Sequence, residues 1–370
     1  MTAPLRYDID LWPGCPAEDQ KRNGRCWIYA SLAPLRRRIC ERFGLSDFHF
    51  STNYIYYYDQ LQKSEAFLDA MIAQRAAHMN DSRLTELLRE PISSVGQWSY
   101  FAALVDGHGV VPLDAMPDTP AAEDGAALTL RLGTLLREGA YRIRTEEDAG
   151  KARKVTMEAI RRTLDEALGK PPEFISWQGG TITPREFLRS VCGYDPHDYI
   201  LLMHHPSDRW PAPCAYHETE EPERRDPLLT MLSVDMETMK ALVLRQLRGG
   251  EPVVIGADVR HAVRRPKGLM DTARLGEPRL SKADAIAYKD ISACHVLCID
   301  GAATEDNGHP TWWRALDSHG SETGLTGHYD MSDAWFEAYV LNAAVKKAYL
   351  SSALRARLDS PVYMPKSERF

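Results

Sequence analysis

Hydrophobic and polar positions repeat along this chain in two ways, and the change between them divides the sequence. From residue 26 to about residue 43 apolar side chains recur at helical spacing, and Gly44 follows as a suitable C-terminal cap. The same spacing predicts further helices over 50–90, 97–106, 128–170 and 236–248. Helices therefore dominate the first half of the predicted structure.

From about residue 171, short apolar segments bounded by Gly, Asp and Asn take over, a pattern typical of antiparallel strands. Such segments read "DYILLMHHP", "EPVVIGADV", "ACHVLCIDG", "TWWRALDS" and "GHYDMS". The stretch "GVVP" at 109–112 also has the pattern of a strand. A helix-rich first part followed by a sheet-rich last part predicts an α+β fold.

Composition narrows the classes of partner. The 370 residues are 44% hydrophobic and 26% charged, an ordinary globular balance, and the formal net charge is −7. An acidic chain has no general electrostatic reason to bind nucleic acid or an anionic membrane, and no apolar run approaches a membrane span. The start of the chain lacks a secretory signal, and seven cysteines do not indicate a disulfide framework. We therefore expect a protein of the reducing cytoplasm.

Cys26 is the candidate nucleophile, because it stands where the first helix should begin. The positive end of a helix favours a thiolate. The backbone N–H of Cys26 and the side-chain amide of Gln20 could donate to the oxyanion of an acyl transfer. The alternative is a small buried core residue, the interpretation that suits the other six cysteines. The stretch "QKRNGRCWIYA" matches a papain-type signature except that Arg25 replaces a small residue.

The candidate base is His295 in "ACHVLCIDG", although a lone histidine on a strand is more often structural. Asp317 follows 22 residues later, after a turn-rich stretch, as expected for neighbouring antiparallel strands, and it could orient the imidazole. The spacing of Cys294, His295 and Cys298 does not match a zinc site. We accordingly expect neither a metal nor a cofactor.

These segments resemble the bleomycin hydrolase and aminopeptidase C branch of the papain-like cysteine peptidases. The resemblance runs from about Trp12 to Pro365. It rests on "QKRNGRCWIYA", "FSTNYIYYYDQLQKSEAFL", "GQWSYFAALVDGHGVVPLDAMPDT", "ITPREF", "GADV", "GLMDT", "MSDAWFEAYV" and "SPVYMP". It implies a papain-like fold with a helix-rich lobe in 1–120, a helical insertion and connecting segments in 121–235, and a sheet lobe with a C-terminal arm in 236–370.

The resemblance also implies a function. The expected activity is that of a cysteine-dependent aminopeptidase or amide hydrolase, which cleaves a small peptide or amide through a thioester acyl-enzyme. The implied substrate-binding residues are Val95, Gly96, Gln97, Trp98, His319 and the C-terminal Phe370, since the arm's carboxylate captures the substrate amine in this branch. A homo-oligomer is also compatible with the resemblance, because relatives form ring-shaped hexamers.

Three departures from the branch's pattern bear on the site. Asp317 stands in place of its asparagine and should stabilise an imidazolium more strongly. His319 stands in place of its tryptophan, and we expect this loss of cover to admit water to the histidine–aspartate pair. Val95 replaces a glycine and should crowd the substrate wall.

Two other functions fit the same motifs. An acyltransferase or amide-bond-forming enzyme would use the same acyl-enzyme and let an amine attack in place of water. A catalytically inactive binding homologue is the less favoured alternative, because Gln20, Cys26 and His295 are all retained.

Overall fold

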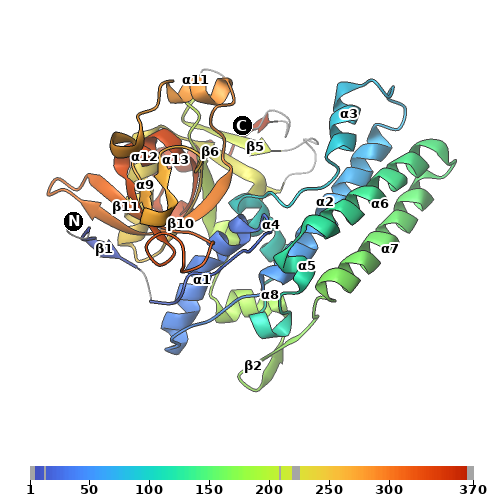
Figure 1. The fold of residues 1–370 in the computed structure, drawn as a ribbon, viewed down its shortest axis with the longest axis horizontal. Coiled ribbons are helices and arrows are strands. Elements are labelled where there is room, and N and C mark those ends of the chain that lie inside the picture. The colour runs from blue at the N-terminus through green and yellow to red at the C-terminus, as the bar shows by residue number, and fades with distance from the viewer. Residues whose placement is uncertain (1–4, 12–13, 208–209, 219–225, 365–370) are drawn as a thin grey trace.

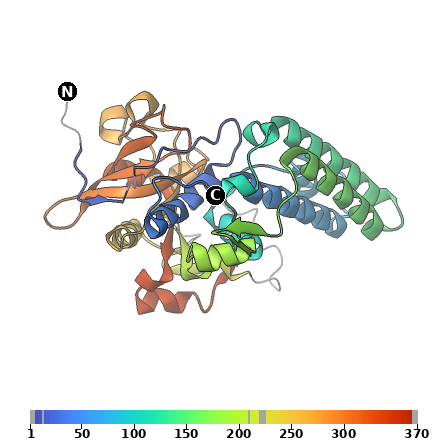
Figure 2. The same cartoon turned by 90° about the horizontal axis from the view of Figure 1, so that it is seen from below.

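The computed structural model describes residues 5–11, 14–207, 210–218 and 226–364 of the chain. Helices gather on one side and a large sheet on the other (Figure 1). The view from below shows the helix that starts at residue 26 between these two parts (Figure 2). No helix in the described ranges is long and apolar enough to cross a membrane.

The helical side is built from long helices whose ends follow local sequence signals. These helices are α1 (Cys26–Phe43), α2 (Thr52–Ala73), α3 (Ser82–Arg89), α4 (Trp98–His108), α6 (Ala126–Thr145) and α7 (Ala149–Leu168), with the short α5 (Pro120–Glu123). Ser51 caps α2 and Asp148 caps α7 through their side chains, and Gly44 ends α1 in the left-handed conformation. The helices predicted from the sequence are therefore confirmed.

Strands from most of the chain join one 12-stranded sheet. Its order is β14 (Val362–Met364), β5 (Cys214–Glu218), β6 (Thr230–Ser233), β4 (Tyr199–Met203), β13 (Val340–Lys346), β7 (Val253–Ala257), β10 (His295–Thr304), β11 (Pro310–Leu316), β12 (His328–Ser332), β9 (Leu269–Met270) and β8 (Val263–Arg264). β1 (Ile9–Asp10) pairs with β10, while β2 (Ile175–Trp177) and β3 (Gly180–Ile182) form a separate hairpin.

Pairing in the centre of the sheet is antiparallel, as predicted, and the α+β arrangement is confirmed. Parallel pairs occur farther out, between β4 and β6, β5 and β14, and β9 and β12. Strands β4, β5 and β6 precede residue 236 yet share the sheet with β7 and β10. The predicted division of the chain into a helix-rich lobe, an insertion and a sheet lobe, with boundaries at residues 120 and 235, stays a prediction.

The strand expected at 109–112 is wrong. Ser51 donates its N–H to the carbonyl of Val111, and Val110 donates to the carbonyl of Pro184. The segment forms only one isolated bridge, between Pro112 and Phe50, and its other backbone contacts are to residues outside the strands, so it is not part of a sheet. Its apolar residues, which suggested a strand, are buried beside the helices instead.

Two hydrophobic cores lie on the two sides of the molecule. The first packs α1, α2, α4, α6 and α7 together and contains Trp27, Tyr56 and Phe101. The second lies between the sheet, α9 (Met236–Arg248) and α12 (Asp333–Tyr339). The other short α-helices of the described residues are α8 (Pro184–Glu186), α10 (Thr272–Leu275), α11 (Lys282–Ala287) and α13 (Ser352–Arg357). Because α1 packs against β10, the junction of the two cores brings Cys26 to the start of that strand.

Candidate active site

Cys26 is the first residue of α1 and is half-buried. The first turn of α1 has no acidic residue, and Arg25 makes no side-chain capping hydrogen bond there. The first N–H groups of a helix lack intrahelical acceptors, so they present partial positive charge to this thiol. The start of α1 therefore directs backbone N–H donors, and no carboxylate of its own first turn, toward Cys26.

His295 begins β10, opposite Ala257 of β7, and is 8% exposed. Its Nε2 lies 2.7 Å from Oδ1 of Asp317, so Nδ1 is the ring nitrogen left for the thiol of Cys26. Burial alone would lower the pKa of His295, but hydrogen bonds with Asp317 and Cys26 raise this pKa to about 10. The imidazolium form is thereby stabilised beside the candidate nucleophile.

Asp317 directly follows β11, whose Leu316 pairs with Cys298 of β10. Its carboxylate accepts three hydrogen bonds, from Nε2 of His295, from Nδ1 of His319 at 2.9 Å and from the backbone N–H of Ser318 at 2.8 Å. Burial alone would raise its pKa, yet the two histidines hold the pKa of Asp317 well below its ordinary value. Asp317 is therefore a carboxylate with fixed orientation.

The position of the missing tryptophan is filled by His319, and the expected entry of water at this pair stays a prediction. His319 takes up the space beside His295, with ring centroids 5.2 Å apart and ring planes inclined by 31°. The side chain of Asp317 is only 2% exposed, whereas that of His319 is 34% exposed. His319 thus packs beside the pair and also hydrogen-bonds its carboxylate.

Gln20 is tied to the same group of residues through Ser318. The hydroxyl of Ser318 donates to Oε1 of Gln20 at 2.6 Å, and the backbone N–H of Gln20 donates to the carbonyl of Ser318 at 2.7 Å. Nε2 of Gln20 donates one hydrogen to the carbonyl of Asn23 at 2.9 Å. A primary amide carries two N–H donors, so a second one is available to an oxyanion.

The structure thus brings Gln20, Cys26, His295 and Asp317 together, and it adds a residue that the sequence analysis missed. Ser318 links the Gln20 side chain to the Asp317 carboxylate, but a serine after an aspartate has no distinguishing pattern in a sequence. Only the pairing of β10 with β11 and the return of the N-terminal segment to residue 318 reveal it.

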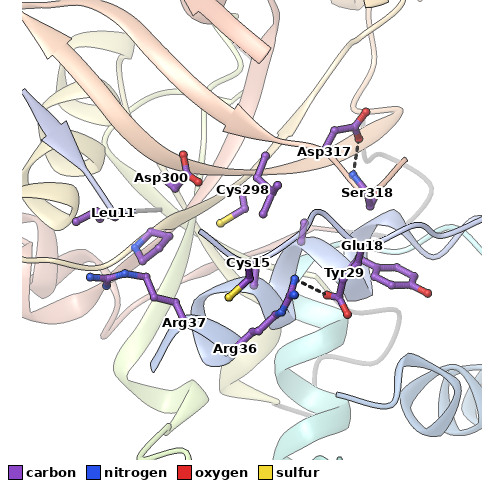
Figure 3. Close-up of a pocket in the computed structure, with 14 residues that line it drawn as sticks. Leu11, Cys15, Glu18, Tyr29, Arg36, Arg37, Cys298, Asp300, Asp317 and Ser318 are labelled. Atoms are coloured by element: carbon purple, nitrogen blue, oxygen red, sulfur yellow. Dashed lines mark hydrogen bonds and ion pairs between the residues drawn. The ribbon is translucent and has the colours of Figure 1, made fainter. Parts of the chain in front are cut away.

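A narrow cavity of about 30 Å³ lies between α1 and the sheet behind this group. Figure 3 shows Asp317 and Ser318 above it, with Cys15, Glu18, Tyr29 and Arg36 on the opposite side. Such a cavity has room for one or two water molecules and none for a peptide. The substrate must therefore approach from another side.

The segment at 94–97 forms a wall beside the start of α1. A Cβ atom at Gly96 would lie 2.4 Å from the indole ring of Trp27, so only glycine fits there. The indole N–H of Trp27 donates to the carbonyl of Ser94 at 3.0 Å. Lys63 donates to the carbonyl of Val95 at 2.7 Å, a contact that the sequence analysis did not suggest. The wall is therefore fixed against the nucleophile helix.

A cavity of about 410 Å³ opens along this wall. Its lining includes Val95, Gly96, Gln97, Tyr100, Met203 and Val296. Val95 is 67% exposed and belongs to the lining, and the crowding of substrate by its side chain stays a prediction. Trp98, by contrast, is 3% exposed and packs against Tyr199, so it supports the wall from behind.

The C-terminal arm approaches the same cavity. β14 pairs in parallel with β5, and Met364 lies opposite Glu218. The buried carboxylate of Glu218 accepts a hydrogen bond from the Tyr100 hydroxyl at 2.6 Å. Residue 364 is thus connected through Glu218 to Tyr100 of the cavity lining, while the predicted contact of Phe370 lies outside the described residues.

Comparisons with known proteins agree with this geometry. Residues 6–366 match the model of the Peptidase C1-like family. Aminopeptidase C of Lactobacillus delbrueckii subsp. lactis is 28% identical over 370 residues, covering 92% of this chain and 81% of that protein. Aminopeptidase C of Lactobacillus helveticus is 29% identical over 382 residues, covering 95% and 84% of the two chains.

A solved structure agrees as well. The crystal structure of PepW from Lactobacillus rhamnosis HN001 superposes with a TM-score of 0.92 at 26% identity and covers 99% of this chain and 88% of that one. The family match and these relatives confirm the resemblance to the aminopeptidase C branch and the papain-like fold, and they support a cysteine aminopeptidase of the hydrolase class.

Proposed function

The chain belongs to the Peptidase C1-like family, and we propose that it removes N-terminal residues from small peptides or peptide-like amides through a thioester acyl-enzyme. The observation that carries this proposal is the position of His295, whose ring interacts with Cys26 on one side and hydrogen-bonds Asp317 at 2.7 Å on the other. A nucleophile, a proton carrier and an orienting group in contact are the parts that acyl transfer requires.

In the first step, Sγ of Cys26 attacks the scissile carbonyl carbon and forms a C–S bond. The developing oxyanion accepts hydrogen bonds from the Cys26 backbone N–H and from the free N–H of Gln20. The C–N bond then breaks, and the leaving amine takes the proton from Nδ1 of His295. Asp317 holds the ring in position by accepting from Nε2.

In the second step, His295 accepts a proton from water, and the resulting hydroxide attacks the thioester carbonyl. The C–S bond then breaks and the carboxylic acid leaves. Because His295 now holds the proton that it took from water, the Cys26–His295 pair is back in its starting state. An attacking amine in place of water would give acyl transfer through the same intermediate, so the proposed hydrolysis depends on which nucleophile reaches the thioester.

Selection for a free amine is supported by the cavity next to the nucleophile. Its volume of about 410 Å³ suits one or two residues rather than a long peptide, and its lining residues Gln97 and Tyr100 both hydrogen-bond the buried carboxylate of Glu218. The aminopeptidases C that resemble this chain are named for removing N-terminal residues, and we extend that activity to this protein.

Intact mass spectrometry tests the proposal. The protein is mixed with a dipeptide amide and, separately, with its N-acetylated form, each with and without a competing amine. We expect an adduct on Cys26 with the free-amine substrate only, resolved by water. If the main product is an amide formed with the added amine, the activity is acyl transfer and not hydrolysis. If no substrate gives an adduct, the proposed enzymatic activity is contradicted.

A compartment can also be proposed. All seven cysteines, each within the described residues, are free thiols in the structure. This supports the reducing cytoplasm as the place where a reactive Cys26 would persist. Labelling of the free thiols of the native protein, in cell extracts prepared under non-reducing conditions, would test this proposed compartment.

A further inference from the structure

Two imidazoles and one carboxylate converge beside the candidate nucleophile. One ligand atom each from His295, Asp317 and His319 lies within 4.8 Å of the other two. His319 is not required by the acyl-transfer steps, since His295 and Asp317 already form the proton carrier and its orienting group. The cluster therefore has one imidazole more than the proposed reaction uses.

We propose that His295, Asp317 and His319 form a binding site for a borderline divalent metal ion, and that Zn²⁺ bound there inhibits the enzyme. Two histidines and a carboxylate are a frequent three-residue ligand set for zinc, with water as the fourth ligand. The set also fits the softness of such ions better than that of Mg²⁺ or Ca²⁺, which prefer oxygen ligands.

The geometry permits coordination with small side-chain movements. Zinc holds its ligands at about 2.0–2.2 Å, which places neighbouring ligand atoms about 3.5 Å apart. Asp317 now lies 2.7 Å from one imidazole nitrogen and 2.9 Å from the other. An ion that replaces these hydrogens must therefore separate the atoms slightly, and the backbone N–H of Ser318 remains as an outer partner of the carboxylate.

Access and charge also favour an ion here. His295 and Asp317 are buried, whereas the side chain of His319 is 34% exposed and gives a route from solvent. Asp19 bridges to His319 through the backbone and adds negative charge nearby, although Lys21 pairs with its carboxylate at 2.9 Å. From the sequence, we expected no metal because the spacing of Cys294, His295 and Cys298 does not match a zinc site, and that group does not include His319.

Occupancy would stop proton transfer. A ring that binds a metal ion through Nε2 keeps its hydrogen on Nδ1, and giving up that hydrogen would leave an imidazolate. His295 could then no longer deliver a proton to the leaving amine. The ion acts here as an inhibitor and takes no part in the reaction, so binding and the proposed function can be tested separately.

The first experiment measures binding without activity. Co²⁺ is titrated into Cys26→Ala protein and followed by its visible absorption. We expect ligand-field bands from Co²⁺ at a single site. Adding the substitution His319→Gln should weaken Co²⁺ binding by roughly tenfold or more. The exposed turn residue His309 provides the matched control, because His309→Gln should leave the titration unchanged. Equal binding with and without His319 would overturn the site.

The second experiment measures inhibition. The Zn²⁺ concentration that halves activity is compared among wild type, His319→Gln and His319→Trp, each relative to its own metal-free rate, because His319 touches Asp317. We expect at least a tenfold increase in that concentration for both variants. Unchanged inhibition, together with a thiolate charge-transfer band for Co²⁺ in wild type, would assign the ion to Cys26 and overturn the proposal. Circular dichroism excludes misfolded variants.

Discussion

The two sides of the active site are built in different ways. Gln20 and Cys26 lie six residues apart in sequence and are placed by one short segment and the start of α1. His295 and Asp317 come from β10 and the end of β11, and pairing between these strands sets their distance. The helix side contributes uncharged donors and a thiol, whereas the sheet side buries a charged pair.

This difference predicts different consequences for catalysis. Donors on the helix side act on charge that develops in the transition state, so their loss should lower the rate at every pH. Groups on the sheet side stabilise the imidazolium of His295, whose pKa is raised to about 10, so their loss should move the pH range of activity. Variants of each side can separate the two effects.

The largest effect is expected at Cys26. Cys26→Ala should lower turnover by on the order of 10⁶-fold, because no acyl-enzyme can form. Brief alkylation with iodoacetamide near neutral pH should also label Cys26 before Cys294. Cys294 is the exposed cysteine, but partial desolvation and the neighbouring Asp258 carboxylate raise the pKa of its thiol. Peptide mapping measures the order of labelling, and faster labelling of Cys294 would contradict the role of the helix.

Gln20→Ala should have the next largest effect. Loss of one oxyanion donor lowers turnover by roughly 10²-fold and leaves the shape of the pH–rate profile unchanged. Steady-state kinetics over a range of pH values would measure both. The exposed Gln62 offers a matched control, since Gln62→Ala should keep full turnover. If Gln20→Ala also keeps it, another group serves as the oxyanion donor.

Ser318→Ala tests whether the two sides depend on each other. Without the hydroxyl that holds Oε1 of Gln20 at 2.6 Å, the amide can rotate, and we expect roughly tenfold lower turnover. The backbone N–H of Ser318 still reaches Asp317 in this variant, so the pH profile should stay in place. Ser318→Thr keeps a hydroxyl and should restore most of the rate. A shifted profile in Ser318→Ala would show that the sides are not separable.

Asp317→Asn should change turnover least near neutral pH, because an amide oxygen can still accept from His295. The active thiolate–imidazolium pair exists below the pKa of His295, and removing the carboxylate lowers that pKa. The alkaline limb of kcat/KM, expected near pH 10 in wild type, should therefore move down by roughly one pH unit or more.

The matched control for this shift is Asp300→Asn, which alters a second buried aspartate–histidine pair in the same sheet, 3.0 Å from His328. It should affect thermal stability without moving the alkaline limb. Identical limbs for Asp317→Asn and wild type would mean that His295 does not set the upper pH limit.

Much of this architecture follows from local sequence. The long helices, their caps and the central strands are set by hydrophobic periodicity and by residues such as Ser51, Asp148 and Gly44, which act within a few positions of themselves. Cys26 and Gln20 could be identified for the same reason, since the helix start and the motif around it are continuous in the chain. The segment at 109–112 was mistaken because a buried segment that makes only a single bridge has the same apolar pattern as a strand.

Tertiary structure alone decided the surroundings of the catalytic pair. Whether Asp317 meets water or a second imidazole depends on how the turn after β11 folds back, and a sequence does not give that direction. Ser318 acquired its partner Gln20 from 298 positions away. Side-chain contacts between distant segments depend on distances of a few tenths of an ångström, which only the packed strands and α1 fix, whereas periodicity fixes only which face of each element is buried.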